Sequence, residues 1–413
     1  MRLLLVFPFI PYPPDNGGRI GYWNTIKYLS RQHAVHVAFL AEDKDREHWD
    51  ALKKQCASMQ ALFRVRPSGL IPMVRGLVGY PPGTAGKFWD PRFTAVLQKA
   101  IKEESIDLVE FHHLHTAVYR DAAGTLPTVL REHNAEYVIW QRHAQHARRL
   151  ERLGARWIAP RVRRYEAAVA EKFDRCVVVS SADADHLRRI SPRARIEVIP
   201  SGVDTEYFFP DGGLPEGSDK MNMVYVGGFD WAPRQHNLRV ILEEIVPRIR
   251  ARLPGVKLHV VGRGIPPYLE RLAAQTAGVT LTGGVPDVRP YIRSASVVLN
   301  YVEIGSGIAL KVLEAMAMRK PVLCNSLACE GIPVTHGKDI LVADGPENFA
   351  CAAASLLENG TLRAAIAESG YRVALARYSW NHLVSEFSNC YAKILEDRVG
   401  GRGLTQVGVG SLQ

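Results

Sequence analysis

Residues 296–318, SVVLNYVEIGSGIALKVLEAMAM, contain the pattern that decides the fold. The short apolar run Ser296–Asn300 is typical of a parallel strand that is buried on both faces. A glycine-rich stretch follows, and apolar residues then recur at helical spacing from Leu310 to Met318. A strand that passes through a glycine-rich loop into a helix leaves backbone N–H groups free, so this pattern indicates an anion-binding site.

Two charged residues interrupt the helix expected over Leu310–Met318. Glu314 stands among valine, leucine, alanine and methionine, and Lys311 lies nearly one turn before it. Burying a carboxylate in such a helix is costly unless the carboxylate accepts hydrogen bonds from a specific partner. Sugar hydroxyls are suitable donors, so the pattern favours a role for Glu314 in ligand binding.

The same alternation of apolar runs and helical stretches extends in both directions from this segment. Strands are predicted over 2–7, 35–40, 61–65, 108–111, 128–131, 176–179 and 196–199, and later over 223–226, 257–261, 279–281, 296–300 and 321–324. Helical spacing is found between them, for example over 20–31, 93–104, 237–252 and 267–277. This order predicts an α/β protein with two doubly wound, Rossmann-like domains that face each other across a cleft.

Turn-rich composition places the domain boundary near residue 205. The stretch 210–219 is polar and rich in glycine and proline, as linkers are. We predict an N-terminal acceptor-side domain over 1–204 and a C-terminal donor-side domain over 205–377. A terminal helix over 378–398 should cross back to the first domain, and the glycine-rich end, 399–413, should be a flexible tail.

The composition is that of a globular protein. Of the 413 residues, 47% are hydrophobic and 23% are charged, which excludes a disordered or fibrous chain. No apolar run is long enough to span a bilayer, and the apolar start contains Pro8 and lacks a cleavage-site pattern. We therefore expect a soluble, intracellular protein. The six cysteines form no C-x-x-C pair, so neither a zinc site nor a disulfide framework is indicated.

The positive charge is concentrated in the first half of the chain. The net charge is +10, and residues 1–200 hold 31 basic and 21 acidic side chains, whereas the remainder holds 21 of each. Many of the arginines fall within Arg148–Arg164. Either this stretch is a solvated helix face or it meets a polyanionic partner such as an anionic membrane. Because Gly154 and Pro160 interrupt it, we expect two short helices here.

Three further motifs leave alternatives open. Gly17 and Gly18 follow the first strand and suit either an anion site or a tight structural turn. The residues GRG at 262–264 lack the third glycine of a dinucleotide fingerprint. His112, His113 and His115 follow a strand and could bind a metal, but we favour polar residues that line the cleft and expect no metal.

Seven segments, taken in order, resemble those of retaining family 4 glycosyltransferases, the group 1 type of the GT-B fold. They are PPDNGG (13–18), REHN (131–134), VIPSGVD (198–204), YVGGFDWAP (225–233), TGGVPD (282–287), GSGIALKVLEAMAM (305–318) and YSW (378–380). The family pattern places two glutamates eight positions apart. Here Ser306 stands where the first is expected, Glu303 lies three residues too early, and amides near Ser306 would substitute for that glutamate.

The resemblance implies the transfer of a hexosyl group from a nucleotide-diphosphate sugar to an acceptor hydroxyl, with retention of anomeric configuration. It implies catalytic roles for His133 at the donor sugar, Glu314 at the donor ribose and Lys311 at the diphosphate. It also implies that the donor-binding residues are Gly17, Gly18, Gly228, Arg234, Gly305, Ser306, Gly307, Ile308, Lys311 and Glu314. The nucleotide sugar is the substrate, and no separate cofactor or metal is expected.

The implied acceptor is a saccharide or a lipid-linked molecule in polysaccharide or glycolipid biosynthesis. Such an enzyme would be cytoplasmic and could attach peripherally to the inner face of the membrane through Arg148–Arg164. Two alternatives remain open: a GT-B-fold nucleotide-sugar epimerase and a basic nucleic-acid-binding protein. We expect no nucleic-acid partner, because the sequence has no helix-turn-helix, zinc-finger or RNA-platform motif.

Overall fold

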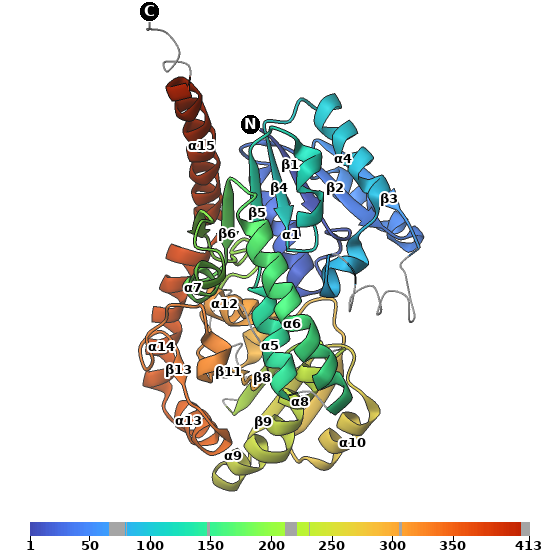
Figure 1. Ribbon diagram of the computed structural model, residues 1–413. Helices are drawn as coiled ribbons and strands as arrows, with labels where there is room; N and C mark the ends of the chain where they lie inside the picture. The colour runs from blue at the N-terminus through green and yellow to red at the C-terminus, as the bar shows by residue number, and fades with distance from the viewer. Residues whose placement is uncertain are drawn as a thin grey trace, which may run out of the picture. The chain divides into compact units, whose positions relative to one another are not determined.

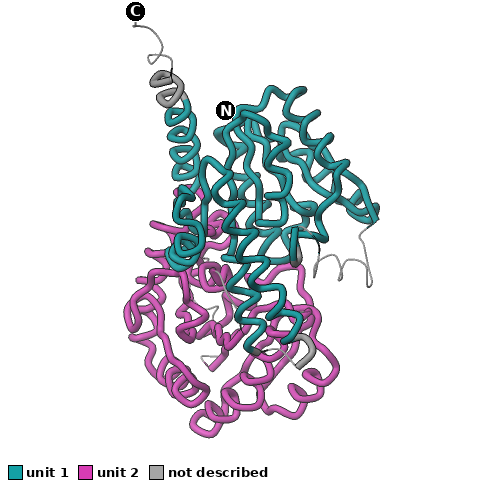
Figure 2. The backbone as a smooth tube through the Cα atoms, in the orientation of Figure 1, with its two compact units in different colours: residues 1–200, 383–413 teal, residues 201–382 magenta. Residues whose placement is uncertain are grey.

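The computed structural model describes residues 1–65, 79, 81–146, 149–210, 221–230, 232–304 and 308–405. The chain divides into two compact units, called here unit 1 (residues 1–200 and 383–413) and unit 2 (residues 201–382), which Figure 2 shows in teal and magenta. Each unit contains a parallel β-sheet with helices around it (Figure 1). The predicted α/β class with two doubly wound sheets is therefore confirmed.

Unit 1 is built on a seven-stranded sheet in the order β3-β2-β1-β4-β5-β6-β7, in which all paired strands are parallel. The strands are β1 (Arg2–Phe7), β2 (Ala34–Ala41), β3 (Ser58–Phe63), β4 (Leu108–His112), β5 (Thr128–Glu132), β6 (Arg175–Val178) and β7 (Ile196–Val198). The central strands are almost wholly buried, as expected where helices cover both faces of a sheet. β1 is apolar after Arg2, whereas β4 and β5 also contain buried charged residues.

The helices of unit 1 begin at residues that suit a helix start. Asn16 caps the first helix through its side chain, Asp90 caps the helix that begins with Pro91, and Ser180 caps a third. The helices are α1 (Gly17–Leu29), α2 (Trp49–Lys53), α4 (Pro91–Glu103), α5 (Glu136–His146), α6 (Arg149–Ala170) and α7 (Ser181–Ile190). Because α1 begins at Gly17 rather than near Ile20, Gly17 and Gly18 form its first turn.

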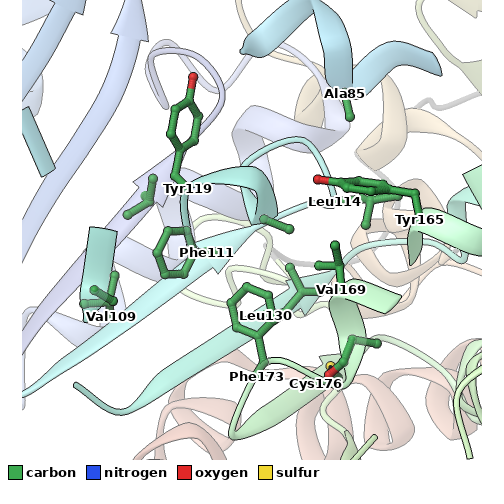
Figure 3. Close-up of a cluster of buried hydrophobic side chains, with 14 of the residues drawn as sticks. Ala85, Val109, Phe111, Leu114, Tyr119, Leu130, Tyr165, Val169, Phe173 and Cys176 are labelled. Atoms are coloured by element: carbon green, nitrogen blue, oxygen red, sulfur yellow. Dashed lines mark hydrogen bonds between the residues drawn. The ribbon is translucent and has the colours of Figure 1, made fainter. Parts of the chain in front are cut away.

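The core of unit 1 lies between the sheet and its helices. Phe111 on β4 packs edge to face against Phe173, which follows α6, with ring centroids 5.6 Å apart (Figure 3). Leu130 on β5 and Val169 on α6 belong to the same buried cluster. Burying side chains of this size contributes about 1.5–3 kcal/mol each to folding.

Unit 2 contains a six-stranded parallel sheet in the order β10-β9-β8-β11-β12-β13. Its strands are β8 (Asn222–Val226), β9 (Lys257–Val261), β10 (Val279–Gly283), β11 (Val297–Asn300), β12 (Val322–Cys324) and β13 (Leu341–Val342). Its helices are α8 (Ala232–Val240), α9 (Val246–Arg252), α10 (Pro267–Gln275), α11 (Arg289–Ser294), α12 (Leu310–Ala317), α13 (Pro346–Glu358) and α14 (Gly360–Val373). One π-helical turn, Ile241–Ile245, joins α8 to α9, so the helix predicted over 237–252 is continuous but irregular.

The arginine-rich stretch corrects one expectation. We predicted two short helices because Gly154 and Pro160 interrupt the pattern, but α6 is one 22-residue helix that passes through both. Proline removes one backbone donor from a helix interior, and the packing of Ile158 and Val162 into the core of unit 1 offsets that loss.

The last helix, α15 (Trp380–Thr405), links the two units in sequence, and its residues from Leu383 onward group with unit 1. The observed division lies at Pro200, a few residues before the predicted boundary at 204. The helix also continues through residues 399–405, which we expected to be a tail. Extending an existing helix adds one hydrogen bond per residue without a new nucleus, which offsets the poor helix propensity of glycine.

Among the described residues, no helix is both long and apolar enough to span a membrane.

Candidate functional site

Ligands of doubly wound proteins bind beyond the carboxyl ends of the strands, at the point where the strand order reverses. In unit 1 this reversal lies between β1 and β4, and in unit 2 it lies between β8 and β11. The sequence-predicted residues divide between the two units. Gly17, Gly18 and His133 belong to unit 1, and the remaining donor-binding residues belong to unit 2.

The pair formed by Lys311 and Glu314 dominates the site of unit 2. Both residues lie on α12, three positions apart, and Glu314 is only 7% exposed. Burial raises the pKa of Glu314 to about 7, although Lys311 acts to lower it. Burial also lowers the pKa of Lys311 to about 7, assisted by Arg234 and opposed by Glu314. Two opposite charges with strongly shifted pKa values at a switch point are typical of a functional site.

Side chains from β8 and α8 surround this pair. The Lys311 ammonium lies over the ring of Tyr225, 4.6 Å from its centroid. Arg234, on α8, donates from Nη1 to the carbonyl oxygen of Gly228, 3.3 Å away. The structure therefore brings together four predicted residues, namely Gly228, Arg234, Lys311 and Glu314. Tyr225 lies in the segment YVGGFDWAP (225–233), but it was not predicted to be a site residue from the sequence.

The loop after β8 is held by the segment GRG (262–264), which lacks the third glycine of a dinucleotide-binding fingerprint. Phe229 N donates to Arg263 O at 2.8 Å, and Gly227 N donates to Val261 O at 2.9 Å. Gly262 has φ +153°, and a Cβ there would lie 1.5 Å from Gly227 O. Only glycine fits such a close approach, so the segment shapes the β8 loop.

Glu303, judged three residues too early for the family pattern, has a definite place in unit 2. Its carboxylate lies 2.7 Å from Nε2 of His236 and accepts a hydrogen bond from Tyr301 at 3.0 Å. Its backbone N–H donates to Asn237 Oδ1 at 3.0 Å. Glu303 is thus anchored at the end of β11 by α8, an arrangement that sequence spacing could not reveal.

Three predicted donor-binding residues, Gly305, Ser306 and Gly307, lie outside the described residues. Ile308 lies just after them, is partly buried, and packs against the apolar cluster that includes Val312. The substitution of serine for the family's first glutamate therefore stays a sequence observation.

Unit 1 gathers its histidines in one place. His133 follows β5 and stacks on His113, with ring centroids 4.2 Å apart, and its Nε2 lies 3.4 Å from Nδ1 of His112. Burial, His113 and Arg131 hold the pKa of His133 well below its ordinary value, so the ring is neutral near pH 7. His113 has φ +64°, a strained conformation of the kind that collects at functional sites.

The histidine cluster rests on a buried polar network that the sequence analysis missed. Glu110 on β4 is wholly buried, and its Oε1 lies 3.0 Å from His112 Nε2 and 3.9 Å from Arg131 Nη1. Tyr391 on α15 donates its hydroxyl hydrogen bond to the other oxygen, Oε2. A charged residue inside the apolar strand LVEFH was the available signal, of the same kind as Glu314 in its helix.

The two glycines at the start of α1 meet few neighbours. A Cβ at Gly17 would meet nothing within 4 Å, and one at Gly18 would meet Asn16 Oδ1 at 3.5 Å. Packing therefore does not demand glycine at either position. The side chain of Asn16 already accepts from Arg19 N in that turn.

Within the described ranges, no group of three His, Cys, Asp or Glu side chains is placed to hold a metal ion. The rings of His113 and His115 are 5.6 Å apart, and His115 meets Phe88 edge to face.

Comparison with known proteins first defines the class. The architecture is that of GT-B glycosyltransferase structures. Sucrose-phosphate synthase from Thermosynechococcus elongatus has a TM-score of 0.74 at 17% identity, covering 96% of this chain and 99% of that one. Anabaena HepE in complex with UDP and glucose has a TM-score of 0.69 at 14% identity, covering 95% and 100%. At these identities the likeness concerns the fold.

The family models are more specific. Residues 16–207 match the model described as Glycosyltransferase Family 4, and residues 220–359 match Glycosyl transferases group 1. The two matches follow one another along the chain, the family 4 model first and the group 1 model second.

A curated relative from Mycobacterium tuberculosis is named GDP-mannose-dependent alpha-(1-6)-phosphatidylinositol monomannoside mannosyltransferase. It is 30% identical over 227 residues, which are 48% of this chain and 56% of the relative. The chain thus spans about half the length of the curated relatives it matches.

Proposed function

We propose that this protein is a retaining glycosyltransferase that moves a hexosyl group from a nucleoside-diphosphate sugar to an acceptor hydroxyl. The observation that carries the proposal is the Lys311–Glu314 pair at the switch point of the segment that matches the group 1 model, in which Glu314 is buried and Lys311 is partly buried. A carboxylate accepts hydrogen bonds from hydroxyls, and an ammonium neutralises phosphate oxygens. Side by side, they suit the ribose and the diphosphate of a nucleotide sugar.

In this proposal each side chain of unit 2 has one task. Glu314 accepts hydrogen bonds from the donor ribose, and Lys311 and Arg234 neutralise the diphosphate as the sugar leaves. Catalysis then rests on stabilising the charge that develops on the leaving group and on holding the reactants in position. Gly228 accepts the hydrogen bond from Arg234, and a Cβ at Gly228 would lie 3.4 Å from Arg234 Nη1, so glycine leaves room for that guanidinium.

His133 in unit 1 is proposed to contact the transferred sugar. Its low pKa keeps the imidazole neutral, with one donor and one acceptor nitrogen for sugar hydroxyls. Gly17, whose Cβ position is open, and Gly18, where a Cβ would meet Asn16 Oδ1 at 3.5 Å, put no side chain of their own on the first turn of α1, where a substrate could approach.

The test is the release of nucleoside diphosphate from a panel of sugar nucleotides. GDP-mannose, named for the mycobacterial relative, and UDP-glucose are the first donors to try. The proposal predicts slow release from one donor by the whole protein, faster release with an acceptor, and loss of both in the Glu314→Ala variant. Salt-sensitive duplex binding without release would instead favour a nucleic-acid-binding protein. Release that leaves an epimerised sugar and needs no acceptor would favour the epimerase.

Retention is tested on the isolated product. The coupling constant of the anomeric proton, measured by NMR, reports the configuration of the new linkage. The proposal predicts the configuration of the donor, and inversion would contradict it.

We further propose that the acceptor is a saccharide or lipid-linked molecule and that α6 attaches the protein to the cytoplasmic face of an anionic membrane. The name of the mycobacterial relative refers to a phosphatidylinositol acceptor, which supports this proposal. Leu153 and Trp157, four residues apart on α6, are 65% and 58% exposed. Exposed arginines flank them at Arg152, Arg156, Arg163 and Arg164. Each arginine near an anionic surface contributes about 1 kcal/mol.

Co-sedimentation with vesicles tests the attachment. We expect binding to anionic vesicles that falls with added salt, and none to neutral vesicles. Trp157→Glu should weaken it, whereas Ala95→Glu, at an exposed position on α4, should weaken it far less. Equal failure on both vesicle types would contradict the attachment and leave α6 as a solvated helix.

A further inference from the structure

Unit 1 contains a chain of three polar side chains, Glu110, His112 and His133, of which only His133 has a proposed role so far. Glu110 Oε1 lies 3.0 Å from His112 Nε2, and His112 Nδ1 lies 3.4 Å from His133 Nε2. Glu110 and His112 are wholly buried, and His133 at the end is partly exposed. The chain therefore runs from the interior of the sheet to the histidine proposed to meet the sugar.

The charge at the buried end is fixed. Burial acts to raise the pKa of Glu110, but contacts with His112, Arg131 and Tyr391 outweigh it and keep its pKa below the ordinary value. Glu110 is thus a carboxylate, which can only accept hydrogen bonds. Burial lowers the pKa of His112, which is therefore neutral and carries a single ring proton.

These two facts determine where the protons lie. His112 Nε2 lies 3.0 Å from Glu110 Oε1 without the alignment of a hydrogen bond. A bare Nε2 would place a lone pair against the negative carboxylate, so neutral His112 carries its proton on Nε2, which leaves its Nδ1 as an acceptor. The only group within hydrogen-bonding distance of that acceptor among the described residues is His133 Nε2, which must therefore carry the proton of the neutral His133 ring. His133 Nδ1 is then an acceptor, and no described residue supplies it with a partner.

We propose that Glu110 and His112 are positioning residues that lock His133 in the Nε2–H tautomer, so that His133 offers a bare Nδ1 to a hydroxyl of the substrate. The role at the substrate rests on the proposed function, whereas the tautomer does not. No proton is transferred along the chain in the resting protein. The arrangement is the usual one for an imidazole whose second nitrogen is oriented by a carboxylate, extended here by one ring.

The direct test is the tautomer of His133 in the wild-type protein. Long-range ¹H–¹⁵N correlation spectra of histidine-labelled protein distinguish protonated from bare ring nitrogens, and His133→Gln identifies the signals. We expect a single tautomer with the proton on Nε2. A proton on Nδ1, or a mixture of tautomers, would overturn the proposal.

Variants then test the cause. His112→Phe keeps a ring of similar size but removes the acceptor, so His133 should become a tautomeric mixture. The rate kcat of nucleoside-diphosphate release should fall by about 10-fold or more with little change in KM for the donor. His36→Asn, which removes a histidine on β2 that contacts Ser58 instead, should leave the His133 signals unchanged.

If His133 keeps its single tautomer in His112→Phe, positioning by His112 is contradicted. If His112→Phe fails to fold, Glu110→Gln, which replaces an obligate acceptor by a group that can also donate, gives the same readout. Should the wild-type protein release no nucleoside diphosphate from any donor, the proposed function fails, and the tautomer measurement still decides the positioning role.

Discussion

Glu314 and Lys311 are opposite charges nearly one helical turn apart, and burial brings the pKa of each to about 7. As the pH rises through about 7, Glu314 gains its negative charge and Lys311 loses its positive charge. The carboxylate is present above pH 7 and the ammonium below it. A donor that needs both charges should therefore bind best near neutrality.

This coupling predicts a bell-shaped pH dependence of donor affinity centred near pH 7, measured by calorimetry between pH 5.5 and 8.5. In Glu314→Gln only the falling limb should remain, and it should move to lower pH, because Glu314 acts to raise the pKa of Lys311. In Lys311→Met only the rising limb should remain, and it should move to higher pH, because Lys311 acts to lower the pKa of Glu314. A flat profile in all three proteins would contradict the pairing.

At the scale of elements, the carboxylate of Glu166 on α6 joins two helices. It accepts from the backbone N–H groups of Glu136 and Tyr137, each at 2.9 Å, at the start of α5. Glu132, at the end of β5, lies beside it, and burial and the neighbouring Glu166 raise the pKa of Glu132 well above its ordinary value. Burial likewise raises the pKa of Glu166 to about 8.

Folding therefore retains protons that the unfolded chain releases, and stability should fall as pH rises from about 4.5 to 8. Glu132→Gln removes one of these groups while keeping its shape. Its melting temperature should match the wild type at pH 4 and exceed it by a growing margin toward pH 8. Glu103→Gln, which removes an exposed carboxylate at the end of α4, serves as the control. A difference that does not grow with pH would contradict the assignment.

The contact between α15 and β4 gives a second prediction at this scale. Tyr391→Phe removes the hydroxyl that donates to the buried Glu110 carboxylate. Hydrogen bonds to charged groups contribute about 1.5–3 kcal/mol, so the melting temperature should fall by several degrees. Tyr378→Phe, at another buried tyrosine, should cost less. Equal losses in both variants would mean that the bond to Glu110 adds nothing specific.

At the scale of the whole molecule, the elements that could be predicted from the sequence are those whose formation depends on residues close together in the chain. Buried parallel strands read as short apolar runs, so the strand Arg2–Phe7 was predicted to the residue, while the two-residue strand Leu341–Val342 was too short to recognise. The course of α6 was mispredicted because tertiary packing outweighs the preference of proline for helix starts.

The residues of the candidate site likewise divide into those that the sequence can reveal and those that only the folded chain reveals. The pairing of Glu314 with Lys311 on one buried helix could be predicted, because two charges in an otherwise apolar helix are visible in the sequence, and the role of Glu314 stays a prediction. Glu110 could have been recognised by the same reasoning. The contacts of Glu303 with His236, and of Tyr225 with Lys311, join residues 67 and 86 positions apart, so only the folded chain reveals them.

The central claim is that Glu314 binds a nucleoside-diphosphate sugar. Calorimetric titration of the wild-type and Glu314→Ala proteins with the donor from which the wild type releases nucleoside diphosphate tests it most directly. We predict binding by the wild type and affinity weaker by about 1.5–3 kcal/mol in the variant, roughly 10- to 150-fold in Kd. Unchanged affinity in a folded Glu314→Ala protein would contradict the claim.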